Sequence, residues 1–243
     1  MKKKSGNYLT FFTPEEKEKI SQTIKKVEQS TSGEIVVLVA DSSNNYDESA
    51  ILGLIGVSMF LGIIIEHLIA IYSKFYSQWD GDNISFGSYL GDFLLQSLNE
   101  TSLWRFLIFT VISFIILYLI MMIYPTLKLR LVSKSKVEKR LKEQAILAFY
   151  QNELYKTCHK TGVLIFISIL ERQVFILGDS GINQKIAEGF WYGLAEELTS
   201  GIRVGRAGES ICRVIEKCGQ ELKKYFPLLD DDKNELSNEV IIK

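Results

Sequence analysis

The chain has 243 residues, of which 47% are hydrophobic and 23% are charged. With 17 glycines and 3 prolines, this composition excludes a disordered or collagen-like chain. The 28 basic and 29 acidic residues give a net charge of -1, which excludes a globally basic nucleic-acid-binding protein. Cys158, Cys212 and Cys218 follow no zinc-ligand spacing, so we interpret them as reduced, mostly buried thiols in a reducing compartment.

The first elements are a predicted helix and a predicted strand. Thr13, Pro14 and Glu16 have the spacing of a helix start with a capping box, and apolar residues follow at helical spacing until Gly33. The run Glu34–Ala40 is β-branched and apolar, which is typical of a strand covered on both faces. A strand of this kind needs neighbours, which must come from later in the chain.

Two apolar runs then interrupt the soluble sequence. Residues 50–73, broken only by Glu66 and His67, and residues 106–127, which hold no charge, are each predicted to form a transmembrane helix, because about 20 apolar residues cross a bilayer. Ionisable groups inside a span are often functional, although Glu66 and His67 can also reach the membrane interface.

The distribution of Lys and Arg predicts how these spans are oriented. Residues 74–104 hold only Lys74, whereas residues 128–140 hold six basic residues. By the positive-inside rule, the loop 74–105 is extracytoplasmic and both termini are cytoplasmic, in the inner or plasma membrane.

After the second span, the pattern predicts a helix over 136–160, strands over 163–170 and 174–177, and helices over 182–198 and 209–225. Residues 1–49 and 128–243 then form one α/β domain of order α-β-(two spans)-α-β-β-α-α. The first two strands should be parallel, since a long crossover joins them, and the third antiparallel.

Several motifs of the chain resemble the TPM-domain family, also called TPM phosphatase-like. They are Pro14–Glu16, Thr31–Val37, Gly162–Phe166 with Glu171 and Arg172, Gly178–Ile182, and Asn234–Leu236. The chain is most similar to bacterial membrane-bound members with two transmembrane helices inserted in the domain. The resemblance implies an α/β/α sandwich with a short mixed sheet. It also implies acid phosphatase activity, a role in the assembly or repair of membrane complexes, or modulation of a receptor.

The predicted topology places candidate functional residues on two edges of the sheet. Glu34 and Asp179 fall on one edge, where their carboxylates can hold Ca²⁺ or Mg²⁺. Alternatively, Asp179 caps the following helix and Glu34 pairs with a lysine. Glu171 and Arg172 fall on the opposite edge with Asp41, and Arg172 is a candidate phosphate-binding group.

A glycine-rich segment with two arginines, residues 201–208, precedes the last helix. Arg203 and Arg206 are predicted, together with Lys128 and Arg130, to bind an anion, for which lipid headgroups are the favoured source. Alternatively, the glycine at 201 ends one helix, the glycine at 208 begins the next, and the two arginines are solvated.

These observations support two hypotheses for function. The first is a membrane-anchored interaction or assembly module for membrane complexes. It contacts lipids and a protein partner in the membrane, through the sheet edge or a helix face, and binds no nucleic acid. The alternative is a metal-assisted phosphatase that acts on a phosphoester or phosphoprotein with Glu34, Asp179 and Arg172.

Overall fold

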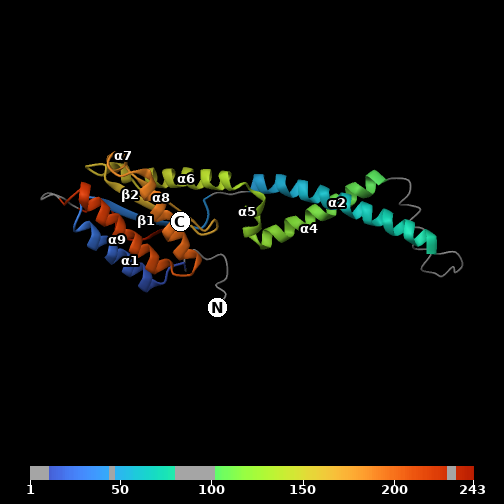
Figure 1. Ribbon diagram of the computed structural model, residues 1–243, viewed down its shortest axis with the longest axis horizontal. Coiled ribbons are helices and arrows are strands. Elements are labelled where there is room, and N and C mark those ends of the chain that lie inside the picture. Colours follow the sequence, from blue (N-terminus) through green and yellow to red (C-terminus); the bar gives the residue numbers. More distant parts are fainter. Residues whose placement is uncertain (1–10, 44–46, 80–101, 229–233) are drawn as a thin grey trace. The chain divides into compact units, whose positions relative to one another are not determined.

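The computed structural model describes residues 11–43, 47–79, 102–228 and 234–243 (Figure 1). The chain forms two compact units, one from Met1–Asn45 with Lys134–Lys243 and the other from Tyr46–Ser133. The first unit is an α/β domain built from both sides of the insertion, and the second contains two long helices. The α/β fold class predicted from the sequence is confirmed.

The described residues of the α/β domain contain a four-stranded mixed sheet in the order β3-β2-β1-β4. Strand β1 (Glu34–Ala40) pairs in parallel with β2 (Gly162–Ser168), and β2 pairs antiparallel with β3 (Gln173–Gly178). Both pairings agree with the prediction. The fourth strand, β4 (Ile241–Ile242), pairs in parallel with the other edge of β1 and is too short to be predicted from its sequence.

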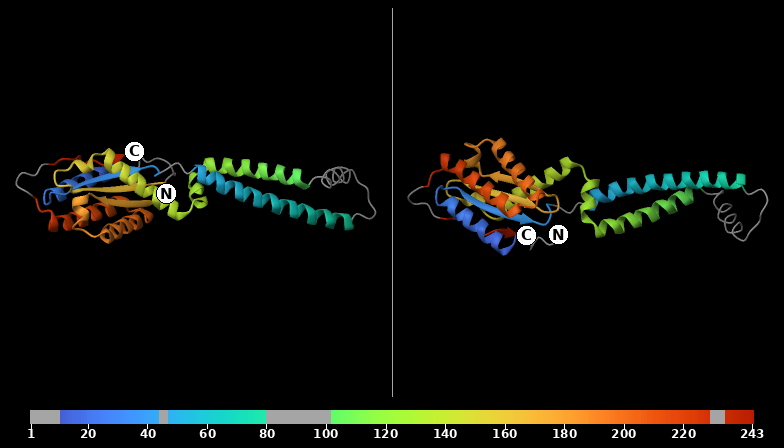
Figure 2. Two further views of the ribbon diagram at one scale, coloured as in Figure 1. Left: turned by 90° about the horizontal axis from the view of Figure 1, so that it is seen from above. Right: turned by 60° about the horizontal axis from the view of Figure 1, so that its bottom comes forward.

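Helices cover both faces of this sheet, so the domain is an α/β/α sandwich (Figure 2). The alternate residues Ile35, Val37 and Val39 pack against α1 (Pro14–Glu28), α8 (Glu188–Arg203) and α9 (Ala207–Tyr225). The intervening residues Val36 and Leu38 pack against α6 (Lys134–Gln151). Because both faces are covered, β1 and β2 are buried along their whole length.

Two predicted helices are interrupted in the structure. The predicted helix 136–160 ends at Gln151, after which Glu153 adopts a positive φ of 59° and the short 3-10 helix η3 (Leu154–Lys156) follows. This bend turns Leu154 into the core between α6 and the sheet. The predicted helix 182–198 is two helices, α7 (Ser180–Asn183) and α8, separated by residues 184–187.

The connection between α8 and α9 also differs from the prediction. Helix α8 continues past Gly201 to Arg203. Gly201 lets Ser210 of α9 pack closely, since a Cβ at this glycine would lie 2.4 Å from the Ser210 Cβ. The chain reverses at Gly205, which has a φ of 80°, and α9 begins at Ala207.

The second unit is a pair of packed helices, α2 (Asp47–Trp79) and α4 (Ser102–Ile123). Both extend beyond the predicted spans at their loop ends, and α4 stops before Pro125, which has no N–H to continue a helix. The short helices η2 (Pro125–Leu127) and α5 (Lys128–Leu131) follow. Residues 80–101 of the predicted extracytoplasmic loop lie outside the described residues.

Candidate functional site

Glu34 and Asp179 lie at the same edge of the sheet, as the topology predicts. Glu34 is in register with Gly162, and the Asp179 N–H donates to the Gly162 carbonyl at 2.8 Å. The two carboxylate-bearing residues are therefore two strands apart, or about 10 Å between their backbones. Leu154 fills the space over the intervening strand, since a Cβ at Gly162 would lie 2.7 Å from the Leu154 carbonyl oxygen.

The carboxylate of Glu34 holds the C-terminal segment against this edge. Its Oε1 accepts a hydrogen bond from the Glu235 N–H at 3.1 Å, and Glu235 Oε2 accepts one from the Cys158 N–H at 3.0 Å. Glu34 itself is buried, whereas Glu235 and Cys158 are exposed, so the buried carboxylate is joined to the surface of the domain through the first of these contacts.

Asp179 caps helix α7, which is the alternative role predicted for it. Its backbone is extended and its Oδ1 accepts a hydrogen bond from the Ser180 N–H at 2.5 Å. Its other oxygen, Oδ2, is buried and has no hydrogen-bond partner in the described part of the chain. Among the residues that the structure describes, no group of three His, Cys, Asp or Glu side chains could hold a metal ion.

Arg172 lies at the opposite edge of the sheet. It ends the β2–β3 turn with a positive φ of 52° and is exposed. The length of β3, about 20 Å at 3.3 Å per residue, separates it from Asp179. The structure therefore does not bring Arg172 together with Glu34 and Asp179.

Glu171, next to Arg172, is the centre of a buried polar cluster. Its Oε1 accepts hydrogen bonds from the N–H and the hydroxyl of Ser43, at 2.9 and 2.5 Å, and its Oε2 accepts one from the Ser168 hydroxyl. Both serines are almost completely buried. The cluster joins Ser43, which follows β1, to the turn after β2, and Ser43 and Glu171 are 128 positions apart in the sequence.

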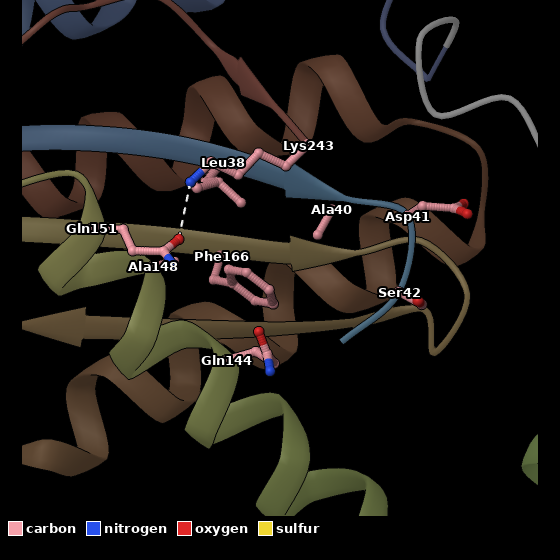
Figure 3. Close-up of a pocket in the computed structure, with 9 residues that line it drawn as sticks. All are labelled: Leu38, Ala40, Asp41, Ser42, Gln144, Ala148, Gln151, Phe166 and Lys243. Carbon is pink, nitrogen blue, oxygen red and sulfur yellow. Dashed lines mark hydrogen bonds between the residues drawn. The ribbon is translucent and has the colours of Figure 1, made fainter. Parts of the chain in front are cut away.

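A cavity of about 260 Å³ opens at this same edge, between α6 and the sheet (Figure 3). It lies at the carboxyl ends of parallel strands, where open α/β sheets bind their ligands. Its floor is apolar and its rim carries the polar side chains. The lining residues are Leu38, Ala40, Asp41, Ser42, Gln144, Ala148, Gln151, Phe166 and Lys243.

The rim of this cavity carries groups of opposite charge at its two ends. The Lys243 ammonium donates to Gln151 Oε1 at 3.2 Å at one end, while Asp41 and Ser42 lie at the other (Figure 3). Such a rim can bind a small polar group by hydrogen bonds. The sequence placed Asp41 on this edge, since it directly follows a buried strand, but gave no signal for Gln151 or Lys243.

The predicted anion-binding residues divide between the two units. Arg203 and Arg206 flank the turn between α8 and α9 and are exposed, whereas Lys128 and Arg130 belong to α5 in the other unit. Within that unit, α5 packs against the beginning of α2, where Leu131 lies beside Gly53.

Glu66 has a partner that the sequence did not predict. Arg105 of α4 donates from Nη2 to Glu66 Oε1 at 2.7 Å, and both side chains are largely buried between the helices. His67, the neighbouring candidate, is exposed. The sequence could have indicated this pair, because Glu66 and Arg105 carry opposite charges and lie near the loop ends of the two predicted spans.

No family model matches the chain, and no curated protein matches it. The chain is similar to a solved structure, the NMR structure of BA42 protein from the psychrophilic bacterium Bizionia argentinensis. The TM-score is 0.53 at 19% sequence identity, and the match covers 96% of each chain. A likeness at this identity shows the α/β fold alone.

Proposed function

We propose that the protein is a two-span integral membrane protein of the TPM-domain type whose cytoplasmic α/β domain binds a protein partner in the membrane. Two helical segments support the proposed membrane anchoring, since Ala50–Tyr72 and Leu103–Ile123 are long and apolar enough to span a membrane. Their large apolar side chains are mostly exposed, as lipid-facing side chains are. The basic residues after the second span support cytoplasmic termini.

An aromatic patch on the outer face of α6 and η3 carries the proposal of a partner. Leu147 and Tyr150 lie three residues apart on the helix surface, and the Tyr150 and Tyr155 rings are 5.5 Å apart. Tyr150 is 59% exposed, and the other two residues are also exposed. Exposed tyrosines held by ring contacts are typical anchors of protein interfaces, because they bury a large area at low entropic cost.

Site-specific photocrosslinking in native membranes tests this proposal. A photoreactive amino acid replaces Tyr150 in the full-length protein, and the matched control replaces Tyr192 of α8, which is 67% exposed on the other helix layer. We expect a discrete adduct from position 150, and we expect Leu147→Ala with Tyr155→Ala to lower its yield several-fold. Equal yields at the two positions, or a yield that the alanines leave unchanged, would refute the interface.

The orientation has a separate test. A reporter enzyme that requires export, fused after Lys243, should be inactive if both termini are cytoplasmic. An active reporter would show that the orientation predicted from the positive-inside rule is wrong.

The buried Asp179 Oδ2, which has no hydrogen-bond partner among the residues that the structure describes, favours a second candidate function, a phosphatase assisted by Ca²⁺ or Mg²⁺. Asp179→Asn is a sharp test because Asn caps a helix as well as Asp does but carries no charge. If the protein is such a phosphatase, the full-length chain should hydrolyse an aryl phosphate. This activity should be lost when a chelator removes the metal ion and in the Asp179→Asn variant. Activity that survives both would exclude this site.

A further inference from the structure

The turn between α8 and α9 exposes an apolar side chain between two arginines. Val204 is 71% exposed at the tip, and Gly205 reverses the chain with a φ of 80°. Arg203 and Arg206 flank it and are exposed, and neither forms an ion pair with any described residue. Val204 does not belong to the hydrophobic core formed by the described residues of the domain.

This turn lies at the edge of the sheet from which the chain continues toward the first span. Gly208, at the start of α9, packs against Glu16 at the start of α1, where a Cβ would lie 2.7 Å from Glu16 Oε1. Helix α1 is joined to β1 by the short segment 29–33, so it runs back along the sheet and begins near the carboxyl end of β1. That end, Ala40, precedes α2 by only six residues.

The chemistry of the turn fits the surface of an anionic bilayer. A small apolar side chain can enter the boundary between headgroups and acyl chains, while guanidinium groups bind lipid phosphates with paired hydrogen bonds. The segment of six residues reaches at most about 20 Å, so membrane anchoring keeps the domain near lipid at a high effective concentration.

We propose that the α8–α9 turn docks onto the anionic headgroup layer of the membrane, with Val204 inserted and Arg203 and Arg206 on lipid phosphates. This inference rests on the membrane anchoring proposed above. It gives the domain a second attachment to the bilayer besides its covalent connection to the spans.

Fluorescence quenching in nanodiscs tests the docking. Val204→Cys in a Cys158→Ser background carries an environment-sensitive fluorophore, while Cys212 and Cys218 are buried. The matched control is Leu228→Cys, which is 50% exposed and follows Pro227, the bridge partner of Thr31 at the opposite edge of the sheet.

The full-length variants are compared in phosphatidylcholine nanodiscs with and without phosphatidylglycerol and with lipids that carry a shallow quencher. We expect quenching at position 204 to rise with anionic lipid, since each arginine raises the equilibrium constant for contact about fivefold. Arg203→Gln with Arg206→Gln, or high salt, should remove that rise, and inorganic phosphate should leave it unchanged. The Leu228→Cys control should show no lipid-dependent quenching.

The outcomes separate the proposals. The docking alone is overturned if the protein inserts into nanodiscs but positions 204 and 228 are quenched equally. It is also overturned if the quenching at position 204 does not depend on lipid charge. Quenching that inorganic phosphate abolishes assigns the arginines to free anions and overturns it as well. A protein that does not insert into nanodiscs overturns the membrane anchoring and the docking together, and failure of the partner interface is measured separately, by crosslinking at Tyr150.

Discussion

The buried cluster around Glu171 predicts a graded loss of stability. Glu171→Ala removes the acceptor of three hydrogen bonds, from the Ser43 N–H, the Ser43 hydroxyl and the Ser168 hydroxyl. Each buried donor left without a partner costs about 1–3 kcal/mol. Because Glu171 is 9% exposed, water can reach part of the site, so we expect a total loss of about 3–5 kcal/mol in the free energy of unfolding.

Two milder substitutions separate the hydrogen bonds from the charge. Glu171→Gln keeps a carbonyl oxygen that can accept from Ser43, and neutral hydrogen bonds contribute less than charged ones, so it should cost about 1–2 kcal/mol. Ser168→Ala removes one donor and should cost about the same. The order of stability should therefore be wild type, then these two variants, then Glu171→Ala.

Thermal unfolding of the full-length protein in detergent, followed by near-ultraviolet circular dichroism, measures the effect. At about 2–4 °C per kcal/mol, Glu171→Ala should lower the Tm by about 10 °C. Glu216→Ala, an exposed carboxylate on α9, is the matched control and should change the Tm by no more than about 2 °C. A Tm for Glu171→Ala equal to that of the control, or to that of Glu171→Gln, would refute the reasoning.

Three further predictions concern packing, burial and charge. Gly219→Ala should destabilise the protein by about 1–3 kcal/mol, because its Cβ would lie 2.2 Å from a methyl group of α1. Gly193→Ala should stabilise α8 by about 0.5–1 kcal/mol, since no described atom lies within 4 Å of the added Cβ. Chemical denaturation measures both changes in the free energy of unfolding, and changes of the same sign would contradict the packing. Burial raises the pKa of the Cys218 thiol to about 12, so at pH 8 an alkylating reagent should modify exposed Cys158 and leave Cys218 intact until the protein unfolds, as peptide mapping would show. Glu66→Gln keeps an oxygen that can accept from Arg105 but removes the opposite charge, so it should lower the stability of the packed pair α2 and α4 by about 1–3 kcal/mol in mixed micelles. A double-mutant cycle of Glu66 and Arg105 with no coupling would exclude the ion pair.

Local periodicity in the sequence determined much of the fold. The run Glu34–Ala40 is apolar at every position, and only a strand covered on both faces buries every side chain, so it indicated the sandwich. The capping box at Thr13 and Glu16 fixed the start of α1, since its hydrogen bonds connect residues three apart. The crossover rule placed Glu34 and Asp179 on one edge of the sheet without any knowledge of side-chain contacts.

The tertiary structure alone decided which side chains meet. The Ser43 and Glu171 contact joins residues 128 positions apart, and the Lys243 and Gln151 contact joins residues 92 apart. No periodic pattern records such pairs, because they depend on the packing of segments that are distant in the chain. Likewise, the aromatic patch on α6 became an interface candidate only once the core had been shown to leave Tyr150 exposed.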